Sequence, residues 1–270
     1  MILSDNHLHS FFSSDSSTKL EDIANTAIAT GLTSICMTDH HDIDFPVDET
    51  NPMDFQLDAP SYIEAVHNIA NTYKGRLEIS TGVELGLMKA VAAKAKAYTS
   101  TYDFDFVIGS SHLVNGIDPY NPEYFYDKTE AKGYRLYFEA ILDNVTCIKD
   151  YDVYGHLDYV VRYGPSKSGN YNFKAYYDIF EAILMQIISD GKGIEINTGG
   201  LYKGLTFPHP KIEILKLYKE LGGEIITVGS DAHSPNYIGY GFDVAESLLQ
   251  KCGFRYYCTF KNRKPIFHNL

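Results

Sequence analysis

Short apolar stretches that end at histidine or acidic residues recur along this chain, separated by longer segments with the period of an amphipathic helix. Six of these stretches have the length and composition of a β-strand. Such an alternation of strand and helix favours a parallel α/β fold, in which the carboxyl ends of the strands share one edge. The polar residues at these ends are His7, His9, Asp39, His40, His41, Glu84, His112, His156, Asp231 and His233. We therefore expect them to converge on one site.

The spacing within the first and last of these groups indicates a metal site. His7 and His9 are two residues apart on a strand, so both rings project to the same face, and Asp231 and His233 repeat that spacing. Nine ligands would be too many for a single ion, and Glu84, the lone acid at its strand end, is the natural bridge between ions. Imidazole and carboxylate ligands without cysteine suit Zn, Mn or Fe. The candidate ligands are His7, His9, Asp15, His40, Glu84, His112, His156, Asp231 and His233.

The strand count limits the architecture. After the first apolar run, strands are expected at residues 34–38, 77–83, 104–110, 151–155, 193–196 and 225–229. Helices are expected at residues 19–30, 61–73, 89–98, 128–144, 173–189, 210–221 and 243–251, with a further edge strand at 255–260. Ligands on six strand ends meet only if the sheet closes or nearly closes, which predicts a TIM-like barrel of seven strands. Residues 1–270 then form one domain, and the Pro-rich and Gly-rich segments 42–60 and 113–126 form walls of the site.

Composition excludes some partners. The net charge of −12 argues against a nucleic-acid groove and against an anionic membrane surface, but it does not exclude a small phosphorylated substrate. The four cysteines lack any C-x-x-C spacing, and no apolar run reaches the roughly 20 residues of a membrane span. The chain starts on a strand, without a basic leader, so a reduced cytoplasm is expected. The oligomeric state is open.

Several polar residues have more than one interpretation. Asp39 is either a ligand or a partner that orients a ligand ring, and His41 is a ligand, a proton donor or a loop residue. Arg162 offers a planar fork suited to phosphoryl oxygens. Asn197 could orient a phosphate oxygen or a substrate amine, and Asp158 is a candidate for reading the rest of the substrate. Structural or surface roles are expected for His67, His209 and His268.

The order of these motifs resembles a known family. An H-x-H near the start, then T-D-H, G-x-E, S-S-H, G-H-x-D and finally G-S-D-A-H is similar to the polymerase-and-histidinol-phosphatase (PHP) family, over essentially the whole chain. The segments GHLDYVVRYG (155–164) and GIEINTGGL (193–201) resemble the branch of that family that acts on histidinol phosphate.

The resemblance implies a distorted (β/α)7 barrel with up to three metal ions at the carboxyl ends of its strands. The first ion would take His7, His9, Glu84 and Asp231; the second would take Glu84, His112 and His156; the third would take His40, His233 and one more ligand. At that last position many members of the family supply a histidine, whereas this chain offers Asp15.

The implied reaction is metal-dependent hydrolysis of L-histidinol phosphate in histidine biosynthesis. Three divalent ions against three carboxylates leave a pocket about three charges positive, which suits a phosphate dianion. Water held between metal ions loses a proton near neutral pH and attacks phosphorus, with Glu84, Asp231, Arg162 and His41 as the expected catalytic residues. The alternatives are a nucleotide or nucleic-acid phosphoesterase, which the charge disfavours, and a catalytically silent metal-binding module, which the nearly complete ligand pattern disfavours.

Overall fold

A sheet of seven parallel strands organises the molecule. The computed structural model describes residues 1–47 and 53–270. The strands follow the order β1-β2-β4-β5-β6-β7-β8, so each strand is hydrogen-bonded to the strands that precede and follow it in this order. They are β1 (Ser4–Leu8), β2 (Ser34–Met37), β4 (Glu78–Gly86), β5 (Phe106–Ser110), β6 (Val153–Tyr154), β7 (Gly193–Asn197) and β8 (Ile226–Gly229).

The first and last strands meet beyond the end of β8. Leu8 pairs with Ala232 in parallel register, the Asp231 amide donates to the His7 carbonyl at 2.9 Å, and the His9 amide donates to the Ala232 carbonyl at 3.0 Å. The buried carboxylate of Asp5 adds hydrogen bonds from the amide and hydroxyl of Ser230, at 2.9 and 2.6 Å. The sheet is therefore a nearly closed barrel, and the expected (β/α)7 architecture is confirmed.

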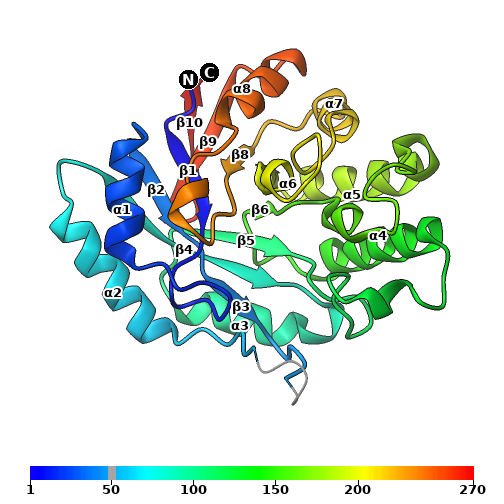
Figure 1. Cartoon of the computed structure of the whole chain (residues 1–270), viewed down its shortest axis with the longest axis horizontal. Coiled ribbons are helices and arrows are strands. Elements are labelled where there is room, and N and C mark those ends of the chain that lie inside the picture. Colours follow the sequence, from blue (N-terminus) through cyan, green and yellow to red (C-terminus); the bar gives the residue numbers. More distant parts are fainter. Residues whose placement is uncertain (48–52) are drawn as a thin grey trace.

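Helices cover the outside of this barrel (Figure 1). Most of the longer helices present an apolar stripe to the strands, as Tyr62, Val66 and Ile69 do on α2. Side-chain caps begin some of them, such as Thr129 at α4, which accepts from the amide three residues on. The helices are α1 (Leu20–Ala29), α2 (Ala59–Thr72), α3 (Ala92–Thr101), α4 (Glu130–Cys147), α5 (Tyr177–Ser189), α6 (Gly199–Tyr202), α7 (Ile212–Glu220) and α8 (Phe242–Lys251).

Several elements differ from the sequence-based expectation, among them the short helix α6. A short strand, β3 (His40–Asp42), branches beside β4 and places His40 directly opposite Glu84. The segment expected as an edge strand at 255–260 does not join the parallel sheet. It forms β9 (Tyr256–Lys261), which pairs in antiparallel fashion with β10 (Lys264–Asn269).

This hairpin closes the amino-terminal end of the barrel. Cys258 and Phe260 of β9 pack against barrel residues that include Phe106 at the start of β5. Ahead of the same strand, Asp105 accepts a hydrogen bond from the Asn262 amide at 3.1 Å. The opposite end, where the strands terminate, is thereby left for the site.

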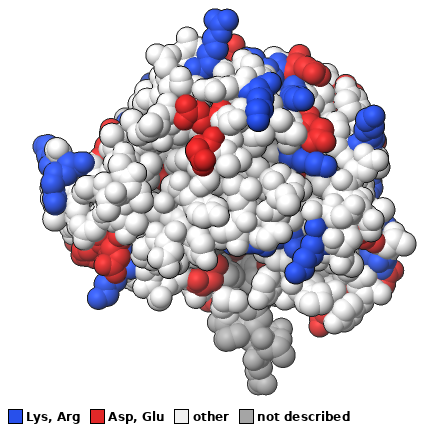
Figure 2. Space-filling view, turned by 45° about the horizontal axis from the view of Figure 1, so that its top comes forward, with Lys and Arg blue, Asp and Glu red and all other residues white. Residues whose placement is uncertain are grey.

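Charges are distributed without a continuous basic track on the face shown in Figure 2, where Lys and Arg side chains are interspersed with Asp and Glu. None of the helices among the described residues combines the length and the apolar character needed to cross a bilayer.

Candidate metal centre

Glu84 lies at the middle of a cluster of histidines at the carboxyl ends of the strands. Its side chain is fully buried on β4, and one carboxylate oxygen accepts a hydrogen bond from the Ser110 hydroxyl at 2.6 Å. Five imidazole rings surround the carboxylate. Oε2 lies 3.1 Å from His7 Nε2, 3.5 Å from His9 Nε2 and 3.0 Å from His40 Nδ1, and Oε1 lies 3.1 Å from His112 Nε2 and 2.8 Å from His156 Nε2.

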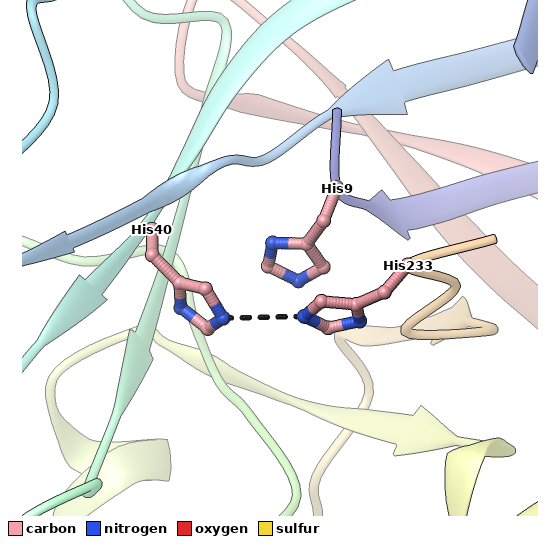
Figure 3. Close-up of side chains that lie close together, drawn as sticks. All are labelled: His9, His40 and His233. Atoms are coloured by element: carbon pink, nitrogen blue, oxygen red, sulfur yellow. Dashed lines mark hydrogen bonds between the residues drawn. The ribbon is translucent and has the colours of Figure 1, made fainter. Parts of the chain in front are cut away.

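The donor atoms form three overlapping groups, in each of which they lie within 4.8 Å of one another. Two groups share Glu84: one contains His7 and His9, and the other His40 and His112. The third is the triad His9, His40 and His233, whose rings gather from the residue directly after β1, from β3 and from the loop after β8 (Figure 3). An arrangement of three groups around shared donors is what a cluster of adjacent metal ions requires.

Asp15 extends the third group. Its Oδ2 lies 3.1 Å from His233 Nε2 and 3.7 Å from His40 Nε2, and these two nitrogens are 3.4 Å apart. Asp231 faces the first group, with Oδ1 3.5 Å from His9 Nε2 and 3.9 Å from His7 Nε2. The structure thus brings all nine residues expected as ligands into one centre.

The chemistry of the donor atoms fits metal ions. Although they are buried and close to one another, His7 Nε2, His9 Nε2, His40 Nδ1 and Glu84 Oε2 make no hydrogen bond within the described part of the chain. Buried polar atoms without partners are costly unless something else coordinates them. Two residues of the centre also adopt positive φ, His156 at 23° and Asp231 at 58°, and backbone strain of this kind clusters at functional sites.

Buried acids orient the histidine rings from behind. Glu195 on β7 accepts from His7 Nδ1 at 2.6 Å, and Asp42 on β3 accepts from His112 Nδ1 at 2.7 Å. Each of these bonds sets the tautomer that turns the other ring nitrogen toward the centre. Sequence reasoning missed both acids, although the acid inside the apolar run GIEIN was a usable signal.

Asp39 acts in the same indirect way. It accepts from the Ser13 hydroxyl at 2.7 Å, and Ser13 Oγ lies 3.2 Å from His9 Nδ1. Of the two roles open for Asp39, the geometry supports orientation of a ligand ring.

Burial and mutual attraction shift the pKa values of the metal-free centre strongly. Burial alone would raise the pKa of Glu84, but His7, His112 and His40 hold it well below its ordinary value. Burial opposes protonation of His7, yet Glu195 and Glu84 outweigh it and raise the pKa of that ring. For His9, burial and the repulsion of His233 and His40 lower the pKa. The cluster therefore holds protons on some rings that metal ions would displace.

A cavity of about 680 Å³ opens onto the centre and carries two cations beside Asp231. Arg162 is buried against the Tyr159 ring, with its guanidinium carbon 4.4 Å from the ring centroid, and Nη1 lies 3.9 Å from Asp231 Oδ2. Lys203, which sequence reasoning missed, places Nζ 3.6 Å from the same oxygen. Nε and Nη1 of Arg162 have no hydrogen-bond partner among the described residues. Two cations next to a metal centre can hold an anion.

Of the four residues expected to contact the substrate, Arg162 lines this cavity, whereas His41, Asn197 and Asp158 do not. His41 accepts from the Leu57 amide at 3.1 Å and stacks on Tyr98, with its pKa lowered to about 4 by burial. Asn197 accepts from the Gly199 amide and donates to Glu195.

Asp158 is fully buried. It bonds His209 Nδ1 at 2.5 Å and accepts from the Lys211 amide at 3.0 Å. His209, expected to be structural, is thus the partner of an acid that had been a candidate for the substrate. Hydrogen bonds inside the protein already occupy these polar groups, so the structure does not bring them to the substrate.

The two expected loops form part of the cavity wall, and the metal centre and the segments around Arg162, Lys203 and Tyr237 form the rest. Phe45, Met53 and Phe55 belong to the first, and Asp118, Tyr120 and Asn121 to the second. Residues 48–52 of the first loop lie outside the described part of the chain.

Comparison with known proteins identifies the family to which this chain belongs. Residues 5–199 match the model of the PHP domain. The chain is 34% identical to a histidinol-phosphatase of Lactococcus lactis, over 97% of this chain and 98% of that protein, and 31% identical to a probable histidinol-phosphatase of Clostridium acetobutylicum, over 97% and 95%.

A solved structure agrees with these relatives. A crystal structure of the Lactococcus lactis histidinol phosphate phosphatase, complexed with zinc, L-histidinol and phosphate, superposes with a TM-score of 0.87 at 33% identity, covering 97% of this chain and 98% of that one. The fold and centre define a PHP-domain barrel, and the chain belongs to the histidinol-phosphatases of the PHP family. The resemblance inferred from the motifs is confirmed.

Proposed function

We propose that this protein is a metal-dependent phosphomonoesterase that hydrolyses L-histidinol phosphate to L-histidinol and phosphate. The observation that carries the proposal is the complete set of donors around Glu84, with Arg162 and Lys203 beside it, in a chain similar end to end to histidinol-phosphatases. The reaction belongs to histidine biosynthesis, and we infer a small phosphorylated molecule as the partner.

The centre would hold two to three divalent ions. His7, His9, Glu84 and Asp231 suit the first, Glu84, His112 and His156 the second, and His40, His233 and Asp15 the third. The donor set accepts Zn²⁺, Mn²⁺ or Fe²⁺, and zinc accompanies the Lactococcus lactis relative. Bound there, such ions supply Lewis acidity and lower the pKa of a water molecule toward neutrality.

The side chains around the centre have distinct tasks. Arg162 and Lys203 would bind the phosphoryl oxygens, whose charge must be stabilised as the ester bond breaks. Because Arg162 is buried and stacked on Tyr159, its guanidinium group is held in place before the substrate binds. His41 lies away from the cavity, so the leaving alkoxide would take its proton from another group.

The charge distribution supports a small substrate rather than a polymer. A nucleic-acid enzyme neutralises phosphates along an extended track, whereas the cations here that face the centre are two side chains on the wall of one cavity. A silent module would be expected to lack ligands, and this chain has donors at every position.

The decisive experiment is phosphate release by metal-replete protein from L-histidinol phosphate, p-nitrophenyl phosphate and a nucleotide monophosphate. We expect kcat/KM for histidinol phosphate to exceed the others by orders of magnitude and to vanish after chelation. Comparable rates on all three would refute the named substrate, and activity that survives removal of metal would refute the mechanism.

A further inference from the structure

One acid on the cavity wall is not engaged with a histidine or a lysine. The acids that line the cavity are Asp15, Asp42, Glu84, Asp118 and Asp231. Asp15, Asp42 and Glu84 each contact an imidazole ring of the centre at 3.1 Å or less. Asp231 lies 3.5 Å from His9 Nε2 and 3.6 Å from Lys203 Nζ. Asp118 forms no such pair within the described part of the chain.

Among the described residues, the contacts of Asp118 leave one of its carboxylate oxygens without a hydrogen bond. Its Oδ1 accepts from the Tyr120 amide at 2.8 Å and from the Tyr159 hydroxyl at 3.4 Å, while Oδ2 accepts no hydrogen bond from any described residue. Arg162, one of the two cations that line the cavity, has its ion-pair contact with Asp231 and none with Asp118. Burial raises the pKa of the Asp118 carboxyl, although the hydrogen bond from the Tyr120 amide and the charges of His112 and Arg162 oppose that rise. A ligand with a positive charge would offset that desolvation.

Tyr159 links this acid to the phosphate site. Its ring centroid lies 5.0 Å from that of His156 and 6.0 Å from that of His112, and Arg162 stacks on it. Asp118 is thus one side chain removed from the metal ligands. In L-histidinol phosphate, four covalent bonds separate phosphorus from the amine nitrogen, so the ammonium must also lie close to the centre.

We propose that Asp118 binds the ammonium group of the substrate and so selects amino-alcohol phosphates over phosphomonoesters without a cation. This inference rests on the proposed function. The aromatic residues Tyr120, Tyr163, Phe45 and Phe55 also line the cavity and provide a surface for the imidazole ring. An acid at this point would act on substrate selection and not on the hydrolytic step.

The test compares two substrates that differ only in the amine: L-histidinol phosphate and 3-(imidazol-4-yl)propyl phosphate. For the metal-replete wild type, kcat/KM should be about 10-fold to 150-fold higher for histidinol phosphate, the range expected for a hydrogen bond to a charged group. Asp118→Asn should lower kcat/KM for histidinol phosphate by a similar factor and leave the deamino substrate within about threefold. Glu123→Gln, which removes an exposed charge from the same loop, should change neither.

Each outcome decides a separate question. If Asp118→Asn lowers both substrates equally, or if the wild type does not distinguish them, the amine role is refuted while the phosphatase stands. If the wild type fails to prefer histidinol phosphate over p-nitrophenyl phosphate, the proposed function fails and this inference with it. Should Asp118→Asn not fold, Asp118→Glu replaces it, and a loss confined to histidinol phosphate supports the role.

Discussion

Replacing Glu195 with glutamine tests whether the acids behind the ligand rings set the metal affinity. Glu195 is fully buried, and Oε1 lies 2.6 Å from His7 Nδ1, while Oε2 accepts from the His156 amide and from Asn197 Nδ2, each at 3.2 Å. All three donors point at one carboxylate, which can accept from every one of them because both of its oxygens are acceptors.

Glutamine cannot satisfy these three donors in either orientation. If its amide group replaces Oε2, it faces the donors of His156 and Asn197. If it replaces Oε1, His7 must move its ring proton to Nε2, the nitrogen that faces the metal centre. Losing such a ring–carboxylate partner typically weakens metal binding 10-fold to 100-fold, or about 1.4 to 2.7 kcal/mol. Full burial leaves no solvent to compensate, so we expect a loss toward the upper part of this range.

The assay is competition for Zn²⁺ between the metal-free protein and a chromophoric chelator. Glu220→Gln, on the exposed end of α7, is the matched control and should bind as the wild type does. Thermal unfolding of both variants shows that each is folded when it is measured. A Glu195→Gln protein that binds Zn²⁺ within about threefold of the wild type would refute the orienting role.

Three further results are expected. Glu84→Gln should lose metal and lower kcat by at least about 10³-fold, and near-normal turnover would contradict its bridging position. Arg162→Ala should lower kcat/KM about 10²-fold to 10³-fold at unchanged metal content, so an unchanged kcat/KM would exclude it from the phosphate site. In the metal-free protein, burial disfavours charge on His40, but Glu84 and Asp15 outweigh it and raise its pKa from 6.5 to about 9. Because protonation of His40 is more favourable in the folded state, it stabilises that state fully below pH 6.5, and the stabilisation is lost as the pH rises through 9. Tm of the metal-free protein should therefore fall between pH 6.5 and 9, and a constant Tm would contradict the raised pKa.

The ligands of the centre could be found from sequence because strand geometry is local. Residues two apart on a strand share a face, and the ends of parallel strands share an edge, so His7, His9, Asp231 and His233 were assignable without coordinates. Glu84 and His156 followed from the same rule. The structure brings each of them to the centre.

The acids that orient the ligand rings, and the residues available to the substrate, could not be predicted from local sequence patterns. Glu195 and Asp42 act across strands, on rings that lie far from them along the chain. Asp158 and Asn197 have the right residue types near the right strand ends, yet hydrogen bonds inside the protein occupy both. Whether a polar group is available to a ligand depends on its neighbours in space, which the periodicity of a segment does not specify.

The same division holds for the fold. Alternating apolar strands and amphipathic helices determined the parallel barrel and the end at which its site lies, since both follow from patterns within single segments. The tertiary structure alone decided that Leu8 meets Ala232 to close the sheet, that the carboxyl-terminal hairpin seals the opposite end, and that β3 places His40 opposite Glu84. It likewise decided that Lys203 joins Arg162 beside Asp231, while Asp118 forms no ion pair with a described residue. These features depend on contacts between distant segments, and the free energy of such contacts is a property of the packed chain rather than of any one stretch of it.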